Sequence, residues 1–165
     1  MIAYMIPGII FLLIFLFWLS GFFSGAPFQP SSDRAMKKMI MLSGVKKGDK
    51  VAELGSGNGK LVVEFAKHGA KVTGFEINPI LVWISRRKIK KFGLQDRAKV
   101  KWKSFWDADL SEFDIISIFQ INYVMRELEG KFKDKIKGKR IVSNTWKFKT
   151  IKPKKRDGHV FLYKF

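Results

Sequence analysis

The sequence contains no cysteine and only two histidines, His68 and His159. The absence of thiols excludes disulfides, thiolate zinc sites and a cysteine nucleophile, and no spacing of His, Asp or Glu indicates a metal site. Acidic residues are also scarce, with 14 Asp and Glu against 32 Lys and Arg, so the formal net charge is +18. This excess indicates attraction to nucleic acid, anionic lipid or an acidic protein, although a solvated Lys-rich face has the same composition.

Charge is also missing from the start of the chain, where the first charged side chain is Asp33. Residues 2–23 are almost continuously apolar, and roughly 22 residues at about 1.5 Å each cross a bilayer core of about 30 Å. We therefore predict a single-pass transmembrane helix over residues 1–24. A cleaved signal peptide is one alternative, but the basic start of such peptides is missing, and a buried helix of a soluble fold is another. Because every Lys and Arg follows this segment, the positive-inside rule predicts that the domain after it lies on the cytoplasmic side.

Residues 25–44 are predicted to form a linker and a short cover helix, which Asp33 caps and Gly44 ends. Residues 45–165 then alternate between strand and helix patterns. One helix is capped by Asn78, opened by Pro79 and expected to carry Trp83 inward. The predicted parallel strands are 51–54, 71–75, 99–103, 115–119 and 140–145, and residues 147–152 and 160–164 are predicted to pair as a closing antiparallel hairpin. This alternation predicts an α/β fold, a Rossmann-like, doubly wound and mostly parallel sheet.

A glycine-rich loop follows the first of these strands and precedes a helix. Its sequence runs Glu53, Leu54, Gly55, Ser56, Gly57, Asn58, Gly59. Such glycines let the backbone approach a ligand, and the helix N-terminus offers free N–H groups to a carboxylate. The third glycine comes one residue earlier than in a dinucleotide-binding loop, which favours the methionine end of S-adenosylmethionine (SAM) over a pyrophosphate. An ordinary strand–turn–helix glycine cluster is the alternative.

An acidic residue, Glu76, closes the second strand. In open α/β sheets a carboxylate at this point accepts hydrogen bonds from both ribose hydroxyls of a nucleoside, and Ile77 could pack on the adenine. A surface glutamate at a strand end is equally common, so the interpretation depends on the glycine loop beside it.

With these motifs the chain resembles the class I SAM-dependent methyltransferases, and more closely the membrane-anchored protein-lysine methyltransferases. The resemblance runs from about Pro27 to Asn144. It is carried by the glycine loop, by the run from Glu76 to Trp83, and by a Pro-aromatic-x-Pro-Ser segment after the apolar run. That segment is formed by Pro27, Phe28, Gln29, Pro30 and Ser31.

The resemblance implies transfer of a methyl group from SAM to a lysine side chain of a protein, which we expect to be membrane-associated. It adds Ser104, Trp106 and Phe119 to the cofactor-binding residues, and Pro27, Phe28, Pro30 and Ser31 as substrate or cover residues. Direct methyl transfer requires alignment rather than a dedicated base, so Gln120 and Asn122 are only candidates for orienting the acceptor. Two other functions stay open. One is methylation of RNA or another nucleic acid, which the basic surface favours but which lacks a motif for a flipped base. The other is a non-enzymatic, membrane-bound SAM-binding module.

Overall fold

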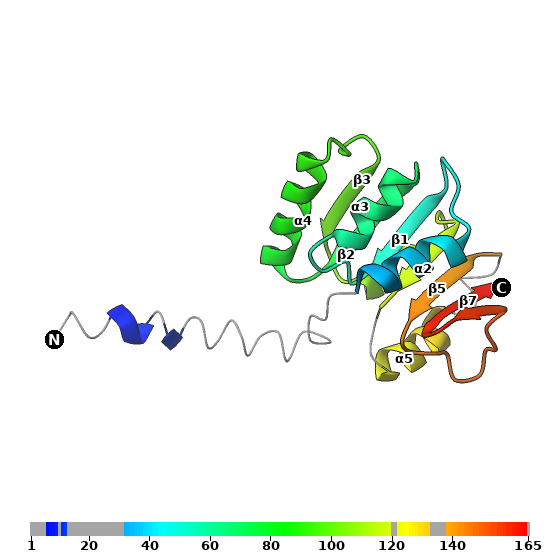
Figure 1. Cartoon of the computed structure of the whole chain (residues 1–165). Helices are drawn as coiled ribbons and strands as arrows, with labels where there is room; N and C mark the ends of the chain where they lie inside the picture. The colour runs from blue at the N-terminus through cyan, green and yellow to red at the C-terminus, as the bar shows by residue number, and fades with distance from the viewer. Residues whose placement is uncertain (1–5, 10, 13–31, 120–121, 133–137, 165) are drawn as a thin grey trace.

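A seven-stranded sheet with the order β3-β2-β1-β4-β5-β7-β6 forms the centre of the domain (Figure 1). The computed structural model describes residues 6–9, 11–12, 32–119, 122–132 and 138–164. Five strands are parallel, and β7 lies antiparallel between β5 and β6. The strands are β1 (Lys50–Leu54), β2 (Lys71–Glu76), β3 (Ala98–Trp102), β4 (Ile115–Ile118), β5 (Arg140–Asn144), β6 (Lys155–Asp157) and β7 (Val160–Lys164). The predicted mostly parallel, Rossmann-like sheet is confirmed.

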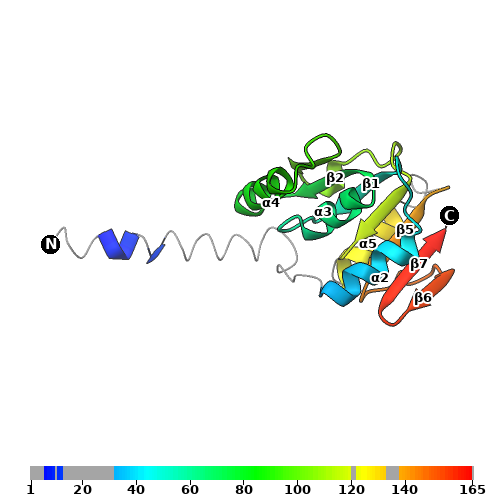
Figure 2. The ribbon, with the colours of Figure 1, turned by 45° about the horizontal axis from the view of Figure 1, so that its top comes forward.

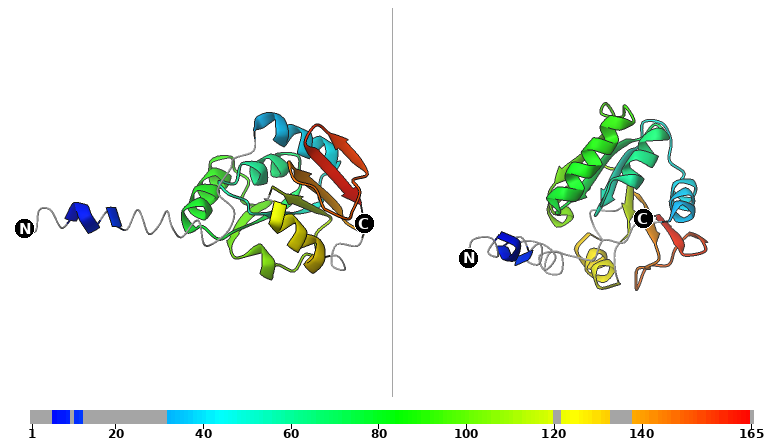
Figure 3. Two further views of the ribbon diagram at one scale, coloured as in Figure 1. Left: turned by 90° about the horizontal axis from the view of Figure 1, so that it is seen from below. Right: turned by 60° about the vertical axis from the view of Figure 1, so that its left-hand side comes forward.

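Helices cover both faces of this sheet (Figures 2 and 3). On one face lie α2 (Asp33–Ser43), α3 (Lys60–Lys67) and α4 (Pro79–Lys91), and on the other lie α5 (Asn122–Phe132) and the short 3-10 helix η1 (Phe105–Asp107). Successive strand residues alternate between the two cores, so Val51 packs against α3 while Ala52 and Leu54 face the α5 side. Strands buried on both faces explain the nearly continuous apolar runs in the sequence.

Helix boundaries follow local capping. Asn78 Oδ1 accepts the N–H groups of Ile80 and Leu81 at 3.0 and 3.3 Å, as its place before Pro79 predicts. The cap of α2 is different from the prediction: Ser32, not Asp33, accepts the N–H of Ala35. The side-chain oxygen of an N-cap residue accepts a hydrogen bond from a backbone amide two or three residues ahead, and here the hydroxyl of Ser32 has that role.

The predicted closing hairpin is wrong in its first strand, because residues 147–152 do not pair with β7. Their backbone is held instead by Glu129 of α5, whose carboxylate accepts the N–H groups of Lys149, Thr150 and Ile151 at 2.8, 2.8 and 3.1 Å. These amides are therefore unavailable to a strand ladder, and β6 pairs with β7 in their place. Burial raises the pKa of the Glu129 carboxyl, but the hydrogen bond from the Thr150 hydroxyl and those from the three amides outweigh burial, so the pKa is lowered.

The predicted inward position of Trp83 is also wrong. Its side chain is 56% exposed, and the buried residues of α4 are Val82, Ser85 and Ile89. Three- and four-residue spacing from Val82 selects this buried stripe, which leaves Trp83 outside it.

Most of the predicted transmembrane segment 1–24, and the linker that follows it, lies outside the described residues. Residues 6–9 and 11–12 are helical, and Ile6, Ile9, Phe11 and Leu12 are each more than half exposed. Within the described ranges, no helix has the length and apolar composition needed to cross a bilayer.

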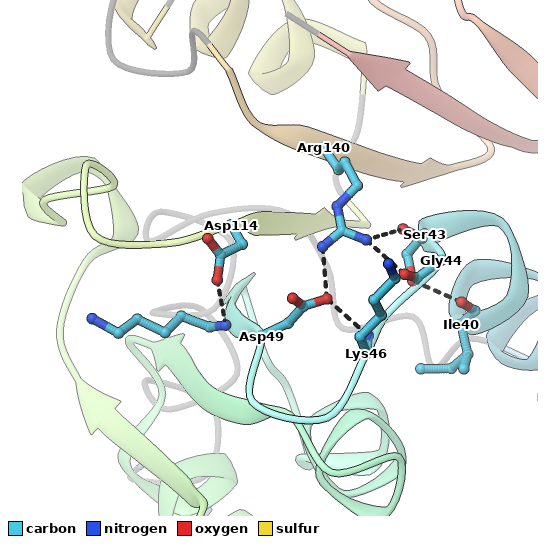
Figure 4. A network of polar contacts seen from close by, with 8 residues as sticks. Ile40, Ser43, Gly44, Lys46, Asp49, Asp114 and Arg140 are labelled. Atoms are coloured by element: carbon cyan, nitrogen blue, oxygen red, sulfur yellow. Dashed lines mark hydrogen bonds and ion pairs between the residues drawn. The ribbon is translucent and has the colours of Figure 1, made fainter.

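Arg140 joins the cover helix to the sheet at the amino ends of the strands (Figure 4). Its guanidinium donates to the carbonyls of Ser43 and Gly44 at 3.0 and 2.6 Å and to Asp49 Oδ2 at 2.6 Å. Asp49 Oδ2 also accepts the N–H of Lys46 at 2.8 Å. One side chain therefore satisfies carbonyls at the C-terminus of α2 and a carboxylate in the turn before β1.

We predict that Arg140→Ala lowers the free energy of unfolding by about 2 kcal/mol, because it removes hydrogen bonds to a partly buried charged group. Urea denaturation monitored by circular dichroism measures this loss. Arg97→Ala is the matched control, since Arg97 pairs with its exposed neighbour Asp96 and its removal should leave the midpoint unchanged. Equal midpoints for both variants and the unmodified protein would contradict this role for Arg140.

Candidate functional site

The candidate site lies at the carboxyl ends of β1, β2 and β4. From β1 the chain passes outward through β2 to β3, whereas β4 pairs with the opposite side of β1. The strand order therefore reverses between β1 and β4, which is the point where open α/β sheets bind ligands. A cleft of about 210 Å³ lies at the opposite, amino edge, beside the first residues of β1, β2 and β3, and is separate from this site.

The glycine loop turns sharply at this point. Gly55, Gly57 and Gly59 have φ angles of 76°, 54° and 72°, in a backbone region that residues other than glycine rarely adopt. The N–H groups of Gly55 and Ser56 both donate to Phe75 O of β2, at 3.0 and 2.9 Å. These bonds fix the loop against the end of the neighbouring strand.

Glu76 holds the loop from the other side. Its Oε2 accepts the N–H of Gly57 at 2.8 Å, and its Oε1 accepts the N–H groups of Ile77 and Asn78, each at 2.9 Å. The residue is only 9% exposed, so these amides replace most of its water. A carboxylate has about four acceptor positions, which leaves room on Oε2 for a ribose hydroxyl.

Glu53 is the second buried carboxyl of the site, and it lacks such donors. Only 3% of the residue is exposed, and its Oε2 has no hydrogen-bond partner. Burial raises the pKa of Glu53 to about 8, and the Ser117 hydroxyl beside it on β4 offsets only part of this rise. Ser117 Oγ also lacks a hydrogen-bond partner, so this hydroxyl lies near the carboxyl without forming a hydrogen bond to it.

The unpartnered atoms gather on one face of the sheet. Glu53 is in register with Gly74 on one side and Ser117 on the other, and a Cβ atom on Gly74 would come within 2.7 Å of Ser56 Oγ. Ser56 Oγ is itself buried without a partner. Three buried polar atoms without partners next to a glycine loop fit the ammonium and carboxylate of the methionine end of SAM.

Gly59, predicted to bind cofactor, has a packing role that the sequence did not reveal. A Cβ atom there would lie 2.8 Å from both Cβ and Oγ of Ser85 in α4. Ser85 Oγ in turn donates to Gly57 O at 2.8 Å. The absence of a side chain at Gly59 therefore lets α4 approach the loop, and Ser85 is a positioning residue missed by sequence reasoning, because a serine within a helix carries no distinctive pattern.

The other predicted cofactor-binding residues lie around the same edge. Ile77 is 37% exposed, and its carbonyl accepts the indole N–H of Trp102 at 2.8 Å. Ser104 caps η1 by accepting the N–H of Trp106, whose half-buried ring packs on Phe105 with centroids 4.8 Å apart. Half-buried Phe119 follows β4 directly. Their roles toward the cofactor remain predictions.

Most residues predicted for the acceptor side of the site lie outside the described residues. These are Gln120 and the predicted cover residues Pro27, Phe28, Pro30 and Ser31. Asn122 is the first residue of α5. Among the residues with described positions, no three His, Asp or Glu side chains gather as metal ligands would.

Several known proteins are similar to this one in fold and in sequence. The ANTKMT methyltransferase domain family matches residues 53–155. The ATP synthase c-subunit lysine N-methyltransferase of Rattus norvegicus is 29% identical over 123 residues, covering 74% of this chain and 56% of the rat protein. A protein-lysine N-methyltransferase of Saccharolobus islandicus is 28% identical over 148 residues, covering 83% of this chain and 92% of that protein. An RNA methyltransferase from Salinibacter ruber, solved with S-adenosyl-L-homocysteine, has a TM-score of 0.78 at 26% identity and covers 82% of this chain and 92% of its own.

The fold and the site are those of the SAM-dependent methyltransferases, and SAM is the cofactor that the residues fit. More narrowly, the chain belongs to the ANTKMT methyltransferase domain family. It spans about half the length of the mammalian relatives that it matches, at 56%, 45% and 49% of the rat, human and mouse proteins. The resemblance inferred from the glycine loop and the run after Glu76 is thereby confirmed.

We predict that SAM binding releases a proton from Glu53 below pH 8. The buried carboxyl is largely protonated at pH 7, and an adjacent ammonium favours its charged form. SAM affinity should therefore rise with pH from about 6, by up to about tenfold per unit, until the amino group of SAM itself loses its proton near pH 8. Calorimetry in buffers of different ionisation enthalpy measures the released proton.

Glu53→Gln is the control for this titration, since the amide has the same shape but does not ionise. The folded pKa of Glu53 lies above its unfolded value of 4.5, so the ligand-free protein should lose stability as pH rises from about 4.5 to about 8. Glu53→Gln should flatten both dependences. An unchanged pH profile for SAM affinity in this variant would rule out the role of Glu53.

We also predict that Glu76→Ala weakens SAM binding by roughly 1.5–3 kcal/mol, because it removes an acceptor for the ribose and releases Gly57. Asn78→Ala is the matched control: it removes the cap of α4, at a cost of about 1 kcal/mol of stability, and keeps the Glu76 carboxylate. Titration calorimetry should therefore find normal affinity in Asn78→Ala alone. Similar affinities for the two variants would overturn the assignment.

Proposed function

We propose that this protein is a SAM-dependent protein-lysine N-methyltransferase whose substrate is a membrane-associated protein. The observation that carries the proposal is the family match over residues 53–155, which includes the glycine loop, Glu76 and the orphaned Glu53. Relatives that share this region are named for lysine methylation of the ATP synthase c-subunit and of proteins more generally.

The chemistry required of the chain is modest. Bound SAM supplies an electrophilic methyl group, and the acceptor nitrogen must lie in line with it. A lysine side chain in water has a pKa near 10.4 and must first lose its proton. A positively charged, partly dry surrounding favours the neutral amine, and the net charge of +18 supports this requirement.

The membrane part of the proposal depends on residues 2–23. This run lacks any charged residue, and the side chains described within it (Ile6, Ile9, Phe11 and Leu12) are largely exposed rather than packed on the domain. We propose that lipid covers them and that the methyltransferase domain lies on the cytoplasmic side, since all Lys and Arg follow the run. A tethered domain meets membrane substrates at high effective concentration.

Methylation of RNA is the second candidate. It is favoured by the basic surface and by the similarity to the Salinibacter ruber protein, which is named as an RNA methyltransferase. A non-enzymatic SAM-binding module is the third, and it requires a filled cofactor site that transfers no methyl group.

We expect the full-length protein, given radiolabelled SAM and the membrane, soluble and RNA fractions of its own cells, to place the label on a lysine of a membrane protein. Mass spectrometry locates the methyl-lysine. Gly57→Arg is the control, because a side chain at this left-handed position fills the loop and should abolish labelling. Label in RNA alone, label in soluble proteins alone, or no label at all would each contradict the proposal.

A further inference from the structure

Three large apolar side chains lie exposed where β3 ends and α4 begins. Ile80, Trp83 and Trp102 are 49%, 56% and 66% exposed. Ile80 and Trp83 are three residues apart and share one face of α4. The indole N–H of Trp102 donates to Ile77 O at 2.8 Å, which holds these two residues against each other.

A hydrogen bond from Arg86 fixes the position of α4 along β3, and with it the position of Trp83 relative to Trp102. Arg86 Nε donates to Val100 O of β3 at 3.1 Å. Trp83 lies one helical turn before Arg86, and Trp102 lies two residues beyond Val100. Because α4 runs antiparallel to β3, both steps lead toward the carboxyl edge, by about 4.5 Å for three helical residues and about 6.6 Å for two strand residues. The two tryptophans therefore occupy the same level of the surface.

Both indole rings are held rather than free. The Arg87 guanidinium lies over the Trp83 ring, 4.3 Å from its centroid, and Trp102 is fixed by its bond to Ile77 O. The surface formed by Ile80, Trp83 and Trp102, which we term the α4 face, is thus a preorganised apolar area.

The stretch of chain that carries the α4 face is strongly basic. Between residues 77 and 106 the only acidic residue is Asp96, which pairs with Arg97 at the start of β3. The same stretch contains nine basic residues: Arg86, Arg87, Lys88, Lys90, Lys91, Arg97, Lys99, Lys101 and Lys103. Exposed tryptophan beside aliphatic side chains, in a basic stretch of chain, is the composition of a surface that rests on a bilayer, where indole rings favour the interface and Lys and Arg attract anionic headgroups.

We propose that the α4 face docks against an anionic lipid surface. Lipid explains features that RNA does not: Ile80 offers nothing to a base, and a stacking platform needs ring faces that are free, whereas Arg87 covers the Trp83 ring. Ile77 follows Glu76 directly, so docking brings the cofactor edge of the sheet next to the headgroups. This docking does not depend on the proposed lysine substrate.

The absence of cysteine makes the test direct, because a single introduced thiol can be labelled. Ile80→Cys places a fluorophore on the α4 face of the full-length protein. Met41→Cys, at a residue 79% exposed on α2, is the matched control at the other end of the sheet (Figure 1). Both proteins are mixed with vesicles that carry a lipid-borne quencher, made of phosphatidylcholine alone or with about 30% phosphatidylglycerol.

The label at residue 80 should be quenched at least about threefold more in anionic than in neutral vesicles, and the label at residue 41 should be unaffected. Arg87→Glu combined with Lys90→Glu, at two positions on the face of α4 that carries Trp83, should remove the difference. Because residues 2–23 are present in every protein, insertion of that run alone quenches both labels alike and overturns the inference. The inference is also overturned by equal quenching in both lipids, by protection of the label at residue 80 by a second copy before lipid is added, or by a response to RNA instead of vesicles.

Discussion

The site depends on one buried carboxylate. Glu76 accepts N–H groups from the glycine loop and from the start of α4, so segments that are distant in sequence meet at two oxygen atoms. Ser85 closes the same ring from α4 through Gly57 O. The loop geometry, the position of α4 and the edge of the sheet are thereby fixed together, before any ligand binds.

Glu53 on β1 and Glu76 on β2 have identical side chains but different surroundings. Three amides surround the carboxylate of Glu76, whereas Glu53 Oε2 is buried with no donor and has a pKa of about 8. An unpartnered carboxyl at a ligand-binding edge is costly unless something completes it. The ammonium of SAM has the charge and donors to do so, which gives the unpartnered oxygen a role in binding.

Sequence patterns predicted the elements whose signals are local. The glycine loop follows a buried strand, Asn78 and Pro79 mark the start of α4, and the strand–helix alternation gives the parallel sheet. Features that depend on tertiary contacts were missed. Glu129 takes the amides of residues 149–151 from the expected hairpin, and Ser85 contacts Gly59 across 26 positions. Neither feature is encoded by neighbouring residues. The exposed position of Trp83, by contrast, follows from the local spacing of the buried residues of α4.

The carboxyl edge between the glycine loop and Glu76 is expected to hold SAM with Glu53 facing its methionine end. A crystal structure of the full-length protein with S-adenosyl-L-homocysteine tests this arrangement most directly. We predict ribose hydroxyls within hydrogen-bond distance of Glu76 and the amino group of the ligand within reach of Glu53 Oε2. A ligand bound elsewhere, or one that leaves both carboxyls without contact, would contradict this assignment.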